Sequence, residues 1–145
     1  MGRRRVRDDR ASVLMLVPAG FLVLIMLSAI AFDYSHIYLA QRQLASSAEA
    51  AANDAVTYAV DQSVLRAGGG YQLDPALVEE AVAQSMAAHG VSGVRVDPPV
   101  VELLSPTRVR VTLTGSVEHV FAKAIPGVPR TASVRATAVA DAVVP

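Results

Sequence analysis

The sequence predicts a membrane-anchored α+β protein. One N-terminal transmembrane helix is expected to continue into a long extracytoplasmic helix, followed by a second short helix and about three antiparallel strands. Three observations carry this prediction: an uncharged apolar run, the absence of Gly and Pro from the segment after it, and a period-two pattern near the C-terminus. We divide the chain into a basic cytoplasmic segment (1–10), a transmembrane helix (11–32), a helical stalk (33–66) and a small α+β domain (67–145).

The apolar run extends from Ala11 to Phe32 without a charge. As a helix these residues span about 33 Å, close to the thickness of the hydrocarbon core of a bilayer. Basic residues immediately before a span stay in the cytoplasm, so we expect the C-terminal part outside. The residues that set this orientation are Arg3, Arg4, Arg5, Arg7 and Arg10, and those expected at the outer membrane interface are Asp33, Tyr34 and Tyr38.

Two other interpretations of this N-terminal region concern processing. A signal peptide cleaved after Ala31 would release a soluble domain, but the run is longer than the usual apolar core of such peptides, which has about 7 to 15 residues. A prepilin-type cut between Gly20 and Phe21 matches weakly, because pilins carry Glu at the position held here by Ile25. We therefore favour a retained anchor.

The stalk has one face of small side chains. From Asp33 to Arg66 the chain lacks Gly and Pro, so we expect the helix to continue without a break. Steps of three and four residues place apolar side chains on one side, and small residues four apart let another element approach closely. This face packs either on the protein's own sheet or on a neighbouring subunit; its residues, beside Ile37, are Leu44, Ala48, Ala51, Ala52, Ala55 and Ala59.

The remaining elements follow from turn and strand signals. Gly68-Gly69-Gly70 marks a turn, and Asp74-Pro75 starts a second helix that we expect to reach His89. Beyond Gly93 apolar and polar residues alternate, which indicates half-buried strands. The expected strands are 94–96 and 100–104 around Pro98-Pro99, a strand centred on 109–113, and 131–143, with a short helical turn within 117–125.

Composition argues against several classes of function. The chain has no Cys, and its three His are far apart without ligand spacing, so we expect no metal, no cofactor and no catalytic residues. No basic stripe with stacking aromatics is present, so we expect no nucleic-acid binding. No nucleophile motif or phosphate-binding loop is present either, so we expect no small-molecule substrate. Asp33 is the polar residue that needs an explanation: it either marks the outer boundary of the span or contacts a basic or N-terminal group of a partner.

Several motifs resemble the N-terminal region of TadE/TadG-like proteins of the tight-adherence (Flp) pilus system. They are Ser12-Val13-Leu14 at the start of the apolar helix, Ala31-Phe32-Asp33-Tyr34, the segment from Tyr38 to Leu44, and the alanine-rich stretch 48–55. The end of the chain, 134–140, is similar as well. The chain lacks the von Willebrand-like domain and the Asp-x-Ser-x-Ser motif of the longer type, so it resembles a short form.

The resemblance implies a non-enzymatic, membrane-anchored pseudopilin-like or accessory component of a bacterial pilus or secretion apparatus. Its expected partners are the lipid bilayer and other membrane-anchored subunits. Two alternatives are an exported soluble binding domain, which requires the cut near Ala31, and an accessory subunit of an envelope enzyme.

Overall fold

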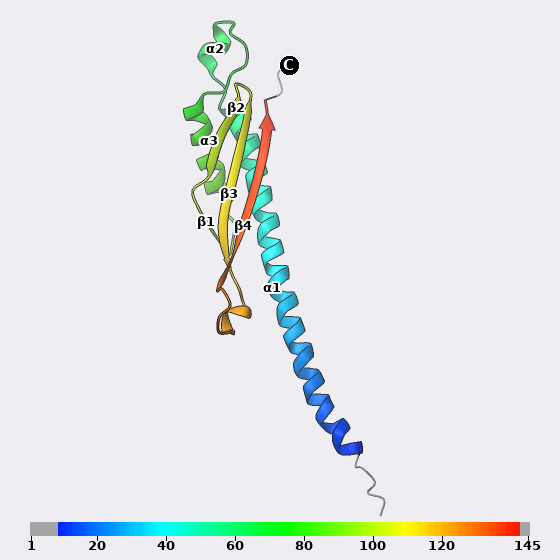
Figure 1. The fold of residues 1–145 in the computed structure, drawn as a ribbon. Coiled ribbons are helices and arrows are strands. Elements are labelled where there is room, and N and C mark those ends of the chain that lie inside the picture. The colour runs from blue at the N-terminus through cyan, green and yellow to red at the C-terminus, as the bar shows by residue number, and fades with distance from the viewer. Residues whose placement is uncertain (1–8, 143–145) are drawn as a thin grey trace, which may run out of the picture.

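The computed structural model describes residues 9–142, with side chains from Leu16 onward, as one long helix that projects from a small α+β unit (Figure 1). The helices are α1 (Asp9–Tyr58), α2 (Gln62–Arg66) and α3 (Pro75–Ala88), with a 3₁₀ turn η1 (Ala122–Ala124). The strands are β1 (Val94–Val96), β2 (Val100–Ser105), β3 (Arg108–Glu118) and β4 (Thr131–Asp141). The predicted α+β class, with a long apolar N-terminal helix and antiparallel strands, is confirmed.

The sheet is antiparallel and is organised around β3. One edge of β3 pairs along its full length with β4, from Arg108↔Asp141 to Glu118↔Thr131. The other edge pairs with β2 and then with β1. Pro98 and Pro99 lack the N–H that a ladder needs, so they separate these two short strands. The sheet therefore has four strands, of which β1 and β2 lie one after the other along the same edge of β3. About three strands were expected.

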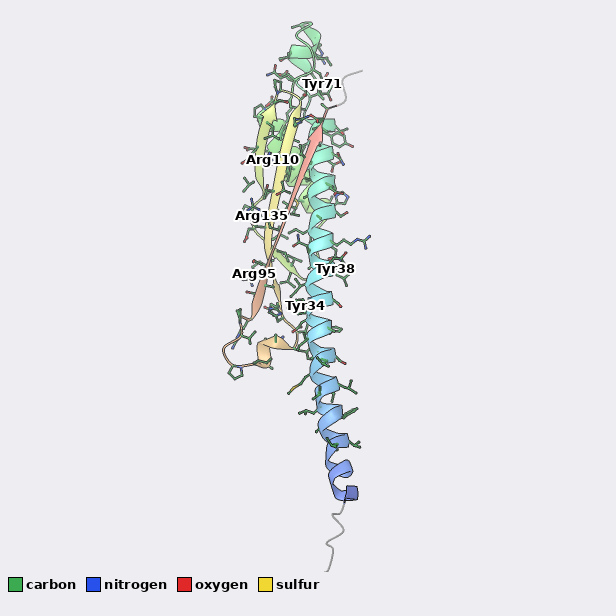
Figure 2. The ribbon with its side chains drawn as sticks, turned by 45° about the vertical axis from the view of Figure 1, so that its right-hand side comes forward. Tyr34, Tyr38, Tyr71, Arg95, Arg110 and Arg135 are labelled. Atoms are coloured by element: carbon green, nitrogen blue, oxygen red, sulfur yellow. The ribbon has the colours of Figure 1, made fainter. Side chains whose placement is uncertain are left out.

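The core lies between one face of the sheet and the helices. Alternate residues of β3 and β4 point inward, as their period-two pattern predicts, while Arg95, Arg110 and Arg135 lie on the face turned away from α1 (Figure 2). The inward residues meet Leu44 and the alanines of α1 together with Val78 and Val82 of α3. The inward set on the sheet comprises Val109, Val111, Leu113, Val117, Val134, Ala136, Ala138 and Ala140.

The stalk helix does not continue unbroken to Arg66. α1 ends at Tyr58, and Val60 forms an isolated antiparallel bridge with Leu73. Asp61 then begins α2, since its carboxylate accepts hydrogen bonds from the N–H groups of Ser63 (2.8 Å) and Val64 (3.1 Å). α2 thus begins at an Asp cap, and the chain between Tyr58 and Asp61 contains neither Gly nor Pro, which is why the sequence pattern missed the break.

The second predicted helix forms nearly as expected. α3 starts at Pro75, where the Asp74 carboxylate accepts a hydrogen bond from the N–H of Ala76 at 2.8 Å, and it ends at Ala88. On α1, the Ser47 hydroxyl donates to the carbonyl of His89 at 3.2 Å and so joins the end of α3 to α1. The two helices thus cover the same side of the sheet.

Candidate functional site

α1 changes character at Asp33. Before it, the described side chains from Leu16 to Phe32 are exposed except for half-buried Ala29; Leu24, for example, is 62% exposed. After it, one side of the helix is buried, with Leu44 and Ala48 both 0% exposed. By length and composition α1 is able to cross a membrane. The junction between the uncovered half and the packed half is therefore the candidate site.

The Asp33 carboxylate holds the loop between β3 and β4. One oxygen, Oδ1, accepts hydrogen bonds from the N–H of Val120 at 2.7 Å and of Phe121 at 3.1 Å. The other, Oδ2, accepts from Phe121 at 3.2 Å and from Ala122 at 2.7 Å. We call this arrangement the Asp33 clasp. Three successive amides at the start of η1 form a concave donor group of the kind that binds anions.

Electrostatics favour the charged form of this aspartate. Burial disfavours the carboxylate, and Asp33 is only 5% exposed. The three amides and nearby His119 outweigh that effect and lower the pKa of Asp33 below the usual value for aspartate. An ionised carboxylate makes stronger hydrogen bonds than a neutral one, so the clasp is a charge-assisted contact.

His119 is the other ionisable group at the clasp. Its Nδ1 lies 3.9 Å from Asp33 Oδ2, which is too long for a hydrogen bond. A His–Asp pair can suggest acid–base chemistry, but here the carboxylate oxygens are engaged by backbone amides. An apolar groove of about 480 Å³ lies beside the pair, and its lining includes Ile30, Ile37 and Val128. The arrangement is suited to holding the loop on α1.

An aromatic contact supports the clasp on the side of the uncovered half of α1. The rings of Phe32 and Phe121 meet edge to face, with centroids 5.6 Å apart and planes at 84°. Such pairs contribute about 0.5–1.5 kcal/mol beyond the area they bury. Phe121 thus joins α1 both through its N–H and through its ring. The loop is fixed against the helix at the point where the uncovered half begins.

A second polar contact ties α1 to the free edge of β4. The Gln41 side-chain amide donates to the carbonyl of Arg135 and accepts a hydrogen bond from its N–H at 3.3 Å. Gln41 thereby pairs with β4 as a neighbouring strand residue would. The contact occupies the β4 edge at Arg135, one position at which another strand could otherwise pair.

The structure places the sequence-predicted residues as follows. Tyr34 and Tyr38 are 72% and 67% exposed on α1 just after the uncovered half. Asp33 contacts backbone amides of its own chain, which neither sequence interpretation included. The residues of the alanine face are at most 1% exposed and pack within this chain, on the sheet and α3; they are Leu44, Ala48, Ala51, Ala52, Ala55 and Ala59.

The structure does not describe the side chains of the five arginines expected to set the membrane orientation. Arg3, Arg4, Arg5 and Arg7 lie outside the described residues, and Arg10 lies in the first turns of α1 without a described side chain. Between residues 16 and 142, no group of His, Asp and Glu side chains has an arrangement that could hold a metal ion. The positions of the tyrosines and arginines relative to a membrane stay predictions.

Sequence reasoning missed the groups that complete the clasp, which are His119 and the amides of Val120 to Ala122. Backbone amides carry no sequence signature. The available signal was Asp33 itself, because an acid directly after an apolar run needs a partner or water.

Residues 11–69 match the family model described as putative Flp pilus-assembly TadE/G-like. The match covers α1 from Ala11 onward, α2 and the turn that follows, and so includes Asp33, Gln41 and the alanine face. Comparison with curated proteins and with solved structures gives no match. The resemblance predicted from the sequence is confirmed for this region: residues 11–69 are similar to the putative Flp pilus-assembly TadE/G-like family.

Proposed function

We propose that the protein is a non-enzymatic, membrane-anchored, pseudopilin-like or accessory component of a bacterial Flp/Tad-type pilus or secretion apparatus. One observation carries the proposal: a single helix is uncovered and apolar over 16–32 and forms part of a domain core over 40–56. The match to TadE/G-like proteins supports it independently.

The uncovered half of α1 is the proposed anchor. Monomeric soluble proteins rarely expose such a continuous apolar surface. Twelve residues between 11 and 32 are Leu, Ile, Val or Phe. At roughly −0.3 to −0.6 kcal/mol each, they favour insertion by about −4 to −7 kcal/mol before the polar residues are counted. The five N-terminal arginines then favour a cytoplasmic N-terminus and an outer C-terminal domain.

The proposed partners are lipid and other membrane-anchored subunits. The alanine face is occupied by the protein's own sheet and α3, so it is not available to a neighbour. The exposed apolar side chains of 16–32 remain for helix packing inside the membrane. We therefore propose that other subunits contact the span (16–32) and not the alanine face of the stalk.

The anchor is tested by fractionation and mass spectrometry of the chain from its native host. We expect it in membranes after an alkaline wash, with residues 1–10 still attached. A mature N-terminus at Phe32 in the soluble fraction would instead establish the exported-domain alternative. For orientation, a reporter active only outside the cytoplasm and fused after Pro145 should work, and neutralising the five arginines should scramble the topology.

The partner is tested with a photo-crosslinking amino acid at Leu24, which is 62% exposed on the uncovered half. We expect crosslinks to small membrane subunits of the pilus system. The matched control carries the same group at Leu104, a leucine 41% exposed on β2. Crosslinks to an envelope enzyme, with none to pilus subunits, would favour the accessory-subunit alternative and refute the pilus role.

A further inference from the structure

The loop from Val120 to Arg130, which joins β3 to β4, is unusually apolar for an exposed connection. Ile125 is 54% exposed and Phe121 is 48% exposed, with Val120 and Val128 at 39% and 37%. Loops normally present polar groups to water. Figure 1 shows this loop beyond the end of the sheet, beside α1. We refer to it as the apolar loop.

The apolar loop lies against the half of α1 that we propose to span the membrane. The Phe121 side chain and α1 together line a groove of about 410 Å³, which extends along the helix from Phe32 back to Leu24 and Phe21. Leu24 precedes Phe32 by about two helical turns. If the span ends near Phe32, the Phe121 ring lies at the outer boundary of the hydrocarbon, since its centroid is 5.6 Å from that of Phe32.

Six backbone N–H groups of the loop donate hydrogen bonds within the protein. Polar backbone groups without partners are costly in lipid. Here three amides donate to Asp33, and three more donate to carbonyls within the loop: Ala124 to Phe121, Ile125 to Ala122, and Val128 to Ile125. Two further positions, Pro126 and Pro129, have no N–H to satisfy.

Charges on the loop fit a membrane surface. Lys123 and Arg130 are both exposed, and long basic side chains can bury their stems while their charged ends reach lipid headgroups. Asp33, whose carboxylate accepts the loop amides, is enclosed by the clasp. The combination of exposed apolar residues and basic residues favours a bilayer interface with anionic lipid.

We propose that the apolar loop inserts into the outer interfacial region of the bilayer beside α1, as a second membrane contact whose depth is set by the Asp33 clasp. This inference depends on the proposed anchor. The occupant of the loop surface is lipid, because the surface is continuous with the uncovered half of α1. The domain is consequently held to the membrane at two points.

Fluorescence quenching by lipid tests the insertion, and the chain's lack of cysteine makes single-site labelling clean. The full chain carries a polarity-sensitive dye at I125C and is reconstituted into vesicles of phosphatidylcholine and phosphatidylglycerol with doxyl-labelled lipid. The matched control is V139C on β4, since Val139 is 51% exposed against 54% for Ile125. We expect most of the fluorescence at 125 to be lost and that at 139 to be kept.

A third label at L24C separates this inference from the anchor. Quenching at 24 without quenching at 125 would overturn the loop proposal and leave the anchor standing, whereas no quenching at 24 would remove both. A dye at 125 shielded from lipid and from an aqueous quencher alike would mean that protein, such as a second copy, covers the loop; this too overturns the proposal.

The role of the clasp is tested with D33N, which weakens acceptance of the three amides. We expect quenching at 125 to fall while quenching at 24 is unchanged. D141N is the matched control, because Asp141 is an aspartate on the far end of the sheet that pairs with exposed Arg108 at 2.7 Å. Equal quenching at 125 in D33N and the parent would show that Asp33 does not set the depth.

Discussion

The alanine face of α1 gives the sharpest test of how the domain is held together. Ala51 is 0% exposed and belongs to the core that α1 forms with the sheet and α3. Replacing it with leucine puts an isobutyl group where a methyl group fits. Ala and Leu have similar helix propensities, so the change acts almost entirely through packing.

The expected loss in the free energy of unfolding for Ala51→Leu is about 1–3 kcal/mol, the usual cost of overpacking a core. A small domain typically has only about 5–15 kcal/mol of stability in total. Ala83→Leu is the matched control because Ala83 is exposed in the middle of α3. That change should alter stability by no more than about 0.5 kcal/mol.

Denaturant unfolding of the full chain in detergent micelles measures both variants. The chain has four Tyr and no Trp, so tyrosine fluorescence can follow the transition. Tyr71 is a useful reporter, since its hydroxyl donates to the carbonyl of Val56 at 3.1 Å and joins the segment between α2 and α3 to α1. Equal stabilities of Ala51→Leu and the parent, or an equal loss in Ala83→Leu, would refute the assignment of the packed face.

Three further outcomes follow from the same packing and from the clasp. Leu44→Ala, at a fully buried position, should lower the free energy of unfolding by about 2–5 kcal/mol in the same assay. Gly115→Ala should be destabilising by about 1–3 kcal/mol, because a Cβ there would lie 2.8 Å from the carbonyl oxygen of Arg95, whereas Gly90→Ala has nothing within 4 Å and should be nearly neutral. Folding lowers the pKa of Asp33, so the stabilisation by the clasp is complete above the ordinary aspartate pKa and is lost as pH falls through the lower folded value. Hydrogen exchange of the three clasp amides, corrected for intrinsic rates, should therefore show a loss of protection only in this acidic range.

Periodicity was enough to predict most of the elements. In β3 the buried apolar residues alternate with polar ones, of which Thr112 is also buried. Arg110 lies opposite Glu102 on the outer face, where the two side chains are 3.1 Å apart. The long helix and its alanine face followed from steps of three and four residues. These are local signals, set by residues that are close in the sequence and share one face.

The contacts that position the candidate site are not local. Asp33 and Ala122 are separated by 89 residues, and Gln41 and Arg135 by 94. Each contact uses backbone amides or carbonyls, which every residue possesses, so the partner has no distinctive side chain to recognise. The end of α1 was missed for a related reason: Asp61 acts through a capping hydrogen bond, and the same residue type is also common on a helix surface.

The unbroken helix across Asp33 has a consequence for assembly. Because Ala48 and Ala51 must face the sheet, the rotation of α1 about its axis is fixed by the domain, and this fixes which sides of 16–32 face the apolar loop and which face away. A flexible linker would remove that relation, but α1 has none between Leu16 and Tyr58. A subunit that contacts the proposed span therefore approaches a surface whose orientation relative to the α+β domain is already set. Under the proposed function, packing of 16–32 in the membrane and placement of the domain are then one event.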